Sequence, residues 1–112
     1  MNEEDADATE VTVLAAVGGK YGAWILCAAD EPVSAQTLSD TLDIPIATCY
    51  RRIEELVEAG MLESHGRTLS AEGRRVTVYV RTVDRLAVTF DGDRPAIESE
   101  PRPETDGRSL DR

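Results

Sequence analysis

The chain has 112 residues, a formal net charge of −10, and 41 % hydrophobic and 30 % charged residues. This length fits one domain and leaves no room for a second core. No apolar run approaches the ~20 residues of a membrane span, and the acidic N-terminus does not fit a secretory signal. We therefore expect a soluble, cytoplasmic protein with no membrane partner.

The negative charge is concentrated at the two ends of the chain. Residues 1–10 carry five acids and no base, and residues 91–112 carry seven acids and four arginines. Such composition does not support a packed core. We predict acidic, disordered tails at 1–9 and 92–112, the second containing prolines, around a domain at 10–91. Only one of the twelve bases is a lysine, which is typical of halophilic proteins, where high salt screens charge repulsion.

The first two predicted elements are helices. A helix around residues 11–17 ends at the Gly18-Gly19 pair. A second helix over residues 20–30 is apolar on more than one side, which predicts burial on two sides. One side would face the core. The other would bind a second copy in a homodimer, through the region of Tyr21, Trp24 and Leu26.

Two short helices joined by a tight turn follow. Ser34 is the expected N-cap of a helix that runs to about Thr41. Pro45 suits the first turn of the next helix, which spans residues 45–59 and ends at Gly60. The apolar side of this helix comprises Ile46, Cys49, Tyr50, Ile53, Leu56 and Val57.

Beyond Met61 the apolar period changes from about 3.6 residues to 2. Val76, Val78 and Val80 alternate with more polar residues after a turn at 71–73, which predicts a β-hairpin. A further alternating run, Leu86–Phe90, predicts a third short strand. The expected fold class is therefore α+β, mainly α.

The stretch VSAQTLSDTLDIPIATCYRRIEELVEAGMLE resembles the helix-turn-helix of ArsR-like winged-helix transcription regulators, especially small ones from halophiles. The residues ATCYRRIEEL, the following EAGML and the strand RRVTVYV carry this resemblance, which covers about Val11–Asp91. It implies a winged helix-turn-helix whose hairpin is the wing. It also implies a transcription regulator that binds double-stranded DNA. With the apolar second side of helix 20–30, we expect this regulator to be a homodimer and a repressor. In that family the second helix enters the major groove, and the hairpin contacts the flanking backbone or minor groove.

Carried onto this chain, the resemblance places the DNA contacts on helix 45–59, the start of the preceding helix and the wing. Arginine pairs bidentately with guanine, and small methyl groups meet thymine. Groups at a helix start hold phosphates. Tyr50 either stacks on a base or anchors its helix in the core. The other implied contacts are Ala47, Thr48, Arg51 and Arg52 on the recognition helix, Ser34 and Gln36 before it, and Arg67, Arg74 and Arg75 on the wing.

Each group of arginines has an alternative role on the protein surface. Arg51 and Arg52 could pair with glutamates three and four residues later. Arginine before glutamate is the weaker orientation, and glutamates near a helix C-terminus oppose its dipole, so DNA contact is the favoured hypothesis. Surface arginines on a hairpin are common, and Glu72 at the turn would repel phosphate. The alternative function is a winged helix used as a protein-interaction module of the transcription machinery.

The sequence offers no catalytic set and no metal site. Cys27 and Cys49 form no paired motif, and His65 is the one histidine. ArsR-like metal sensing therefore does not carry over, and we expect no cofactor and no enzymatic activity. Both cysteines suit small core positions. The alternative is a thiol switch at Cys27, near the dimer surface, whose oxidation would move the DNA-reading helices.

Overall fold

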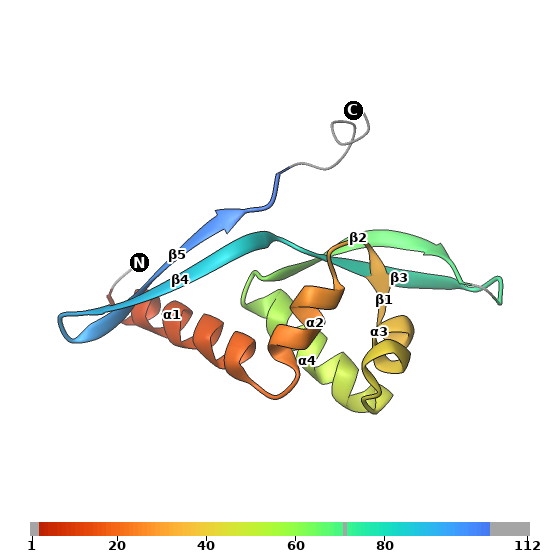
Figure 1. Ribbon diagram of the computed structural model, residues 1–112, viewed down its shortest axis with the longest axis horizontal. Helices are drawn as coiled ribbons and strands as arrows, with labels where there is room; N and C mark the ends of the chain where they lie inside the picture. Colours follow the sequence, from red (N-terminus) through yellow and green to blue (C-terminus); the bar gives the residue numbers. More distant parts are fainter. Residues whose placement is uncertain (1–2, 71, 104–112) are drawn as a thin grey trace.

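The computed structural model describes residues 3–70 and 72–103, in which helices and strands form two layers (Figure 1). The helices lie together on one side of the strands. They are α1 (Glu3–Gly18), α2 (Gly22–Ala28), α3 (Ala35–Leu42) and α4 (Ile46–Glu58). The strands are β1 (Val33–Ser34), β2 (Leu62–Leu69), β3 (Arg75–Arg81), β4 (Val83–Asp91) and β5 (Arg94–Pro101).

The core lies where the helices meet the start of β2. Its largest fully buried side chains come from α2, α3, α4 and β2: Ile25, Leu38, Cys49, Ile53, Leu56 and Leu62. The predicted boundaries of the two central helices are confirmed. The Ser34 hydroxyl accepts the Thr37 N–H at 3.1 Å, as an N-cap does. Gly60, at φ 82°, follows the end of α4 in the left-handed conformation that glycine adopts most readily.

Three strands form the first sheet, in the order β1-β3-β2. The central strand β3 is antiparallel to both neighbours. Tyr79 of β3 packs against the helical core. Val78 and Val80, on the alternate positions, are also buried but do not belong to that core cluster. The predicted hairpin is therefore confirmed, and β1 adds a third strand to it.

The second sheet pairs β4 with β5, from Val83 opposite Pro101 to Asp91 opposite Arg94. The predicted strand at 86–90 is thus confirmed and belongs to a second hairpin. The prediction of a disordered tail is wrong for Arg94–Pro101, because β4 supplies this acidic segment with a partner strand. The other predicted tail is helical from Glu3. Once Val13 and Ala16 are packed, extending the helix costs little, because helix formation is cooperative.

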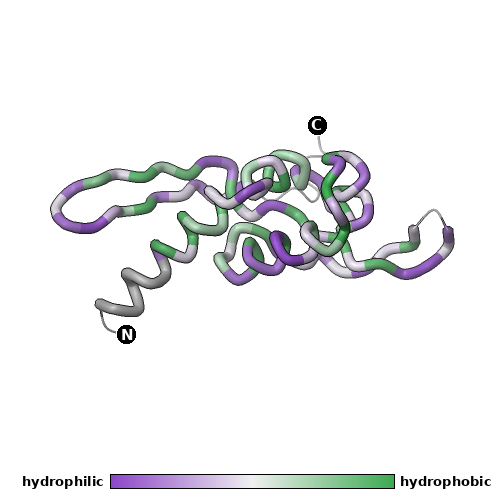
Figure 2. Tube along the Cα trace, turned by 90° about the horizontal axis from the view of Figure 1, so that it is seen from below, coloured by the Kyte–Doolittle hydropathy of each residue, from purple (hydrophilic) through white to green (hydrophobic). Residues whose placement is uncertain are grey.

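The two hairpins extend toward opposite ends of the molecule, with the helices between them (Figure 2). No single helix within 3–70 and 72–103 is long and apolar enough to cross a membrane. The segments Glu10–Gly18 and Gly22–Ala28 pass that test only as a pair, which bends by 82° at its break.

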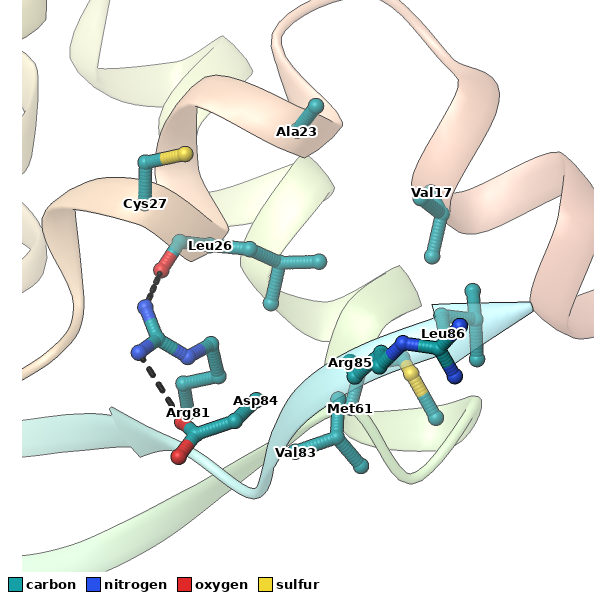
Figure 3. A pocket seen from close by; sticks show the side chains of 10 residues that line it. All are labelled: Val17, Ala23, Leu26, Cys27, Met61, Arg81, Val83, Asp84, Arg85 and Leu86. Atoms are coloured by element: carbon teal, nitrogen blue, oxygen red, sulfur yellow. Dashed lines mark hydrogen bonds and ion pairs between the residues drawn. The ribbon is translucent and has the colours of Figure 1, made fainter. Parts of the chain in front are cut away.

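Arg81 joins the second hairpin to the helices (Figure 3). Its Nη1 donates to the Leu26 carbonyl at 2.8 Å, and its Nη2 lies 3.1 Å from Asp84 Oδ1. The Arg81 backbone N–H also donates to the Ala29 carbonyl, at 2.8 Å. A cavity of about 320 Å³ lies beside this connection, and most of its lining is apolar: Val17, Ala23, Leu26, Met61, Val83 and Leu86.

We expect Gly22→Ala to lower the free energy of unfolding by about 1–3 kcal/mol, the usual range for overpacking. A Cβ at Gly22 would lie 2.3 Å from the Ala16 carbonyl oxygen and 2.9 Å from that of Val17, so α1 or α2 would have to shift. Chemical denaturation measures the loss. Gly18→Ala is the matched control, because nothing lies within 4 Å of its Cβ position. Equal stability of Gly22→Ala and the wild type would contradict this packing.

Candidate nucleic-acid interface

α3 and α4 are joined by a tight turn at residues 43–45 that is held by hydrogen bonds. Asp43 adopts a left-handed conformation, with φ 59°, which a short polar side chain tolerates. The Ile44 N–H donates to the Ser39 carbonyl at 3.1 Å. In return the buried Ser39 hydroxyl donates to the Ile44 carbonyl at 2.5 Å. These reciprocal bonds fix α3 relative to α4.

The buried side of α4 fixes which residues of this helix face outward. Cys49, Ile53 and Leu56 are each at most 1 % exposed, and the Cys49 thiol lies 3.5 Å from the Ala35 carbonyl oxygen. Burial raises the pKa of this thiol, so Cys49 is a neutral core group, as predicted. The exposed residues of α4 form an outward stripe at helical spacing: Ile46, Ala47, Tyr50, Arg51, Glu54, Val57 and Glu58.

Arg51 and Arg52 do not share a surface. Arg51 is exposed and forms no ion pair with any residue that the structure describes. The Arg52 side chain is only 22 % exposed, and its Nη1 lies 2.5 Å from Glu55 Oε1. A Cβ on Gly19 would lie 3.7 Å from the same nitrogen, so Arg52 lies against the turn between α1 and α2. The prediction that Arg52 lies on the exposed side of the helix is therefore wrong.

The reason is helical spacing. Arg52 lies three residues after Cys49 and four before Leu56, so these two buried residues are its neighbours on the helix surface. Thr48 is half-buried as well. Of the four positions predicted to face DNA, the structure leaves Ala47 and Arg51 fully on the outside.

Tyr50 lies at the edge of the core, 50 % exposed, rather than inside it. It is close enough to Tyr79 of β3 to affect its ionisation. Burial raises the pKa of the Tyr79 phenol, and Tyr50 and Glu54 raise it further. Tyr79 thus remains a neutral hydroxyl where the wing meets α4. The sequence analysis did not include Tyr79 among the candidate DNA contacts. The signal was its alternation with Val78 and Val80, which places Tyr79 on the opposite face of β3.

The wing carries its basic residues at its far end. Arg67, Arg74 and Arg75 are all exposed. The tip is held by the Ser70 hydroxyl, which accepts the N–H groups of Glu72 and Arg74, both at 3.2 Å. His65 is also exposed on β2. The wing therefore presents three arginines to solvent, with one carboxylate, that of Glu72, within the turn.

At the start of α3, the two predicted phosphate ligands already have partners within the chain. Ser34 caps the helix and its hydroxyl also donates to Thr37 Oγ1 at 3.1 Å. The Gln36 side chain is exposed and donates to Asp40 Oδ1 at 3.1 Å. The Ser34 hydroxyl oxygen is thus engaged by the cap, whereas Gln36 remains open to solvent.

Residues 13–65, just under half of the chain, match the family model of a helix-turn-helix domain. This range contains α2, α3 and α4 and the start of β2. The hairpin β2–β3 follows the second helix of the pair at once. The fold is a winged helix-turn-helix. Its expected class, α+β, is confirmed, with α4 in the position of the recognition helix and β2–β3 as the wing. A comparison with curated proteins finds no match.

The structure places the second helix differently from the prediction. α2 buries Ile25 and Leu26, and Ala29 just after it is also buried, so Trp24 and Cys27 are turned outward. Cys27 is exposed, and its predicted core position is wrong. Of the predicted dimer region, Leu26 is 9 % exposed and buried, Trp24 is 67 % exposed, and Tyr21 is half-buried, so Leu26 is not open to a partner. Within the described chain no three His, Cys, Asp or Glu side chains could hold a metal ion.

Measurements of the free energy of unfolding should distinguish the roles of Arg51 and Arg52. Arg52→Ala removes a half-buried side chain and its partner for Glu55, and we expect a loss of roughly 0.5–1 kcal/mol in the free energy of unfolding. Arg51→Ala changes an exposed, unpaired side chain and should stay within about 0.5 kcal/mol of the wild type. Urea denaturation compares the two variants. A larger loss for Arg51→Ala would contradict the assignment of the two side chains.

Proposed function

We propose that this protein is a DNA-binding transcription regulator that reads the major groove with α4 and contacts the flanking backbone with the β2–β3 wing. The exposure of Arg51 carries this proposal. Its guanidinium projects from the first half of a helix whose opposite side is buried, and no described carboxylate holds it. Arginine in that position can pair bidentately with guanine O6 and N7, and the Ala47 methyl one turn earlier can meet a thymine methyl.

The backbone of the DNA would be held on both sides of α4. Pro45 supplies no side-chain cap to α4, so the first N–H groups of this helix are free to bind a phosphate. The wing offers Arg67, Arg74 and Arg75, and α3 offers the exposed Gln36. Tyr50 and the neutral Tyr79 hydroxyl add hydrogen-bond donors between the helix and the wing.

The acidic residues limit how α4 can enter a groove. Glu54 and Glu58 lie in the second half of the outward stripe and would repel phosphates, whereas Ala47, Tyr50 and Arg51 lie in the first half. Helix-turn-helix proteins contact bases with the N-terminal residues of the recognition helix, which suits this distribution. In molar salt, counterion release contributes much less to affinity, so base contacts and DNA shape would carry more of the binding.

We further propose that the regulator acts as a homodimer and as a repressor. A two-fold pair presents two α4 helices to half-sites about one helical turn, or a multiple of it, apart. Bound across a promoter, such a pair would exclude the polymerase.

One observation favours a different function. Glu54, Glu58 and Glu72 are exposed on the same elements that would contact DNA, and a protein partner with basic side chains could bind there. A winged helix that serves as a protein-interaction module is therefore the second candidate, and it predicts that no DNA fragment binds at any salt concentration.

Arg51→Ala should weaken specific DNA binding about 5- to 150-fold for each half-site, which corresponds to the roughly 1–3 kcal/mol of one bidentate base contact. The sites come from selection of bound fragments from genomic DNA, and fluorescence anisotropy measures the affinities. The preference for one base pair in each half-site should be lost as well. Arg94→Ala, which removes the same charge at the tip of the β4–β5 hairpin, is the control. Equal affinities of wild type and Arg51→Ala would reject the proposed reading mode.

Arg74→Ala should weaken binding to all DNA sequences by the same factor. We expect the slope of log affinity against log salt to fall in magnitude by about 0.9 for each subunit, the value for one lost phosphate contact, with the same base preferences as the wild type. Binding titrations at several salt concentrations give the slope. An unchanged slope would show that the wing tip does not contact the backbone.

A further inference from the structure

Strand β4 has an edge with no partner among the residues that the structure describes. β4 pairs with β5 on one side only, and it is β5, not β4, that makes the main contacts of this hairpin with α1. β4 is nine residues long and contains neither proline nor glycine. A long exposed edge of this kind is a template for pairing with another strand.

The two strands of the hairpin differ in how their outer edges are protected. β5 contains Pro95 and Pro101, which have no N–H to donate, and the exposed Glu98 and Glu100. Prolines and charges are the usual protection of a permanent edge strand. The centre of β4, Leu86–Phe90, has no charge and no proline. β5 is therefore suited to remain an edge, whereas β4 is suited to receive a further strand.

The apolar face of the hairpin continues beyond the core of its own chain. Val88 lies opposite Ile97, and Phe90 lies opposite Pro95 on the same face. Leu86 and Ile97 pack against the helical core. Phe90, at the far end, is 81 % exposed. Phe90 therefore extends the apolar face of the hairpin beyond the part that its own helices cover.

We propose that two copies of the chain pair edge to edge through antiparallel β4 strands, about a two-fold axis at Val88. The result is a four-stranded sheet in the order β5-β4-β4-β5. Leu86 then lies opposite Phe90 of the second copy, on one continuous apolar face, and Arg85 lies opposite Asp91 of the second copy. Each contact occurs twice because the interface is isologous. Opposed residues of antiparallel strands share a face and stabilise the pairing.

Neighbouring registers lack this complementarity. Centring the axis on Ala87 would place Asp84 opposite Phe90 of the second copy. Centring it on Thr89 would place Ala87 opposite Asp91 and leave Arg85 beyond the end of the other β4. A register that joins the apolar face of one hairpin to the polar face of the other is excluded because it would leave Phe90 uncovered. The β4 strand is thus self-complementary about Val88.

This inference rests on the proposed homodimer and gives it a surface other than the Tyr21, Trp24 and Leu26 region. The helices of one chain lie on one side of its strands (Figure 1). A two-fold axis perpendicular to the joined sheet keeps both sets of helices on the same side. Both α4 helices could then face one DNA duplex.

A symmetric cysteine cross-link tests the axis directly. In the full chain carrying Cys27→Ser, Val88→Cys should form a disulfide-linked dimer, because opposed Cα atoms in an antiparallel pair are about 4.5–5.5 Å apart, within the range of a disulfide. Ile97→Cys in the same background is the matched control, since it lies beside Val88 on the strand away from the axis. Non-reducing electrophoresis shows the cross-link, and analytical ultracentrifugation shows the oligomeric state.

A charge exchange tests the register. Arg85→Asp should raise the dimer dissociation constant about tenfold, because two like-charged pairs replace two ion pairs. Adding Asp91→Arg should restore the dimer. Arg85 also lies 3.8 Å from Glu100 of its own chain, and this contact is not repaired in the double variant, so restoration reports on the second copy. Circular dichroism verifies that each variant is folded.

The outcomes separate this inference from the proposed function. A dimer that fails to cross-link at residue 88 overturns the β4 pairing and leaves a homodimer through another surface. A chain that is monomeric at low and at molar salt overturns both the pairing and the homodimer. Neither result bears on the contact of α4 with DNA, which Arg51→Ala tests by itself.

Discussion

The burial of one side of α4 is the constraint on which the rest of the candidate interface depends. Cys49, Ile53 and Leu56 fill the core between α3, α2 and β2, and a helix advances about 100° per residue. Their positions therefore determine the direction of every other side chain on the helix. The same packing turns Arg51 outward and holds Arg52 against the α1–α2 turn, although the two residues are adjacent in the chain and chemically identical.

The charge around the first half of α4 and the wing tip differs from the net charge of the protein. A net charge of −10 would oppose the approach of any polyanion if it were spread evenly. The first half of the α4 stripe contains no acid, and three arginines lie around the wing tip. The exposed carboxylates on the same elements, Glu54, Glu58, Glu63 and Glu72, would limit the proposed contact to a narrow region. High salt would screen the repulsion from the remainder of the surface.

The second hairpin shows that an acidic segment forms a strand when tertiary contacts support it. Residues 94–101 have little apolar content of their own. They nevertheless form β5, because β4 offers a paired strand and because Ile97 reaches the core that the helices create. Arg81 connects this hairpin to α2 through the Leu26 carbonyl and Asp84. An arginine on the wing strand thus stabilises the fold and is not available to DNA.

The sequence alone determined the order of the four helices, the capping at Ser34 and Gly60, the α3–α4 pair and the hairpin behind it. Local chemistry decides these features, since caps, turns and apolar periods act over a few residues. The position of Arg52 beside Cys49 and Leu56 was also present in the sequence as helical spacing. Only the tertiary structure decided that Cys27 and Trp24 face outward, that Tyr79 lies beside Tyr50, and that residues 94–101 form a strand. The first two depend on partners distant in the chain, which no local pattern contains. β5 pairs with its chain neighbour β4 across residues 92–93, but the packing of Ile97 against the helices holds this hairpin in place.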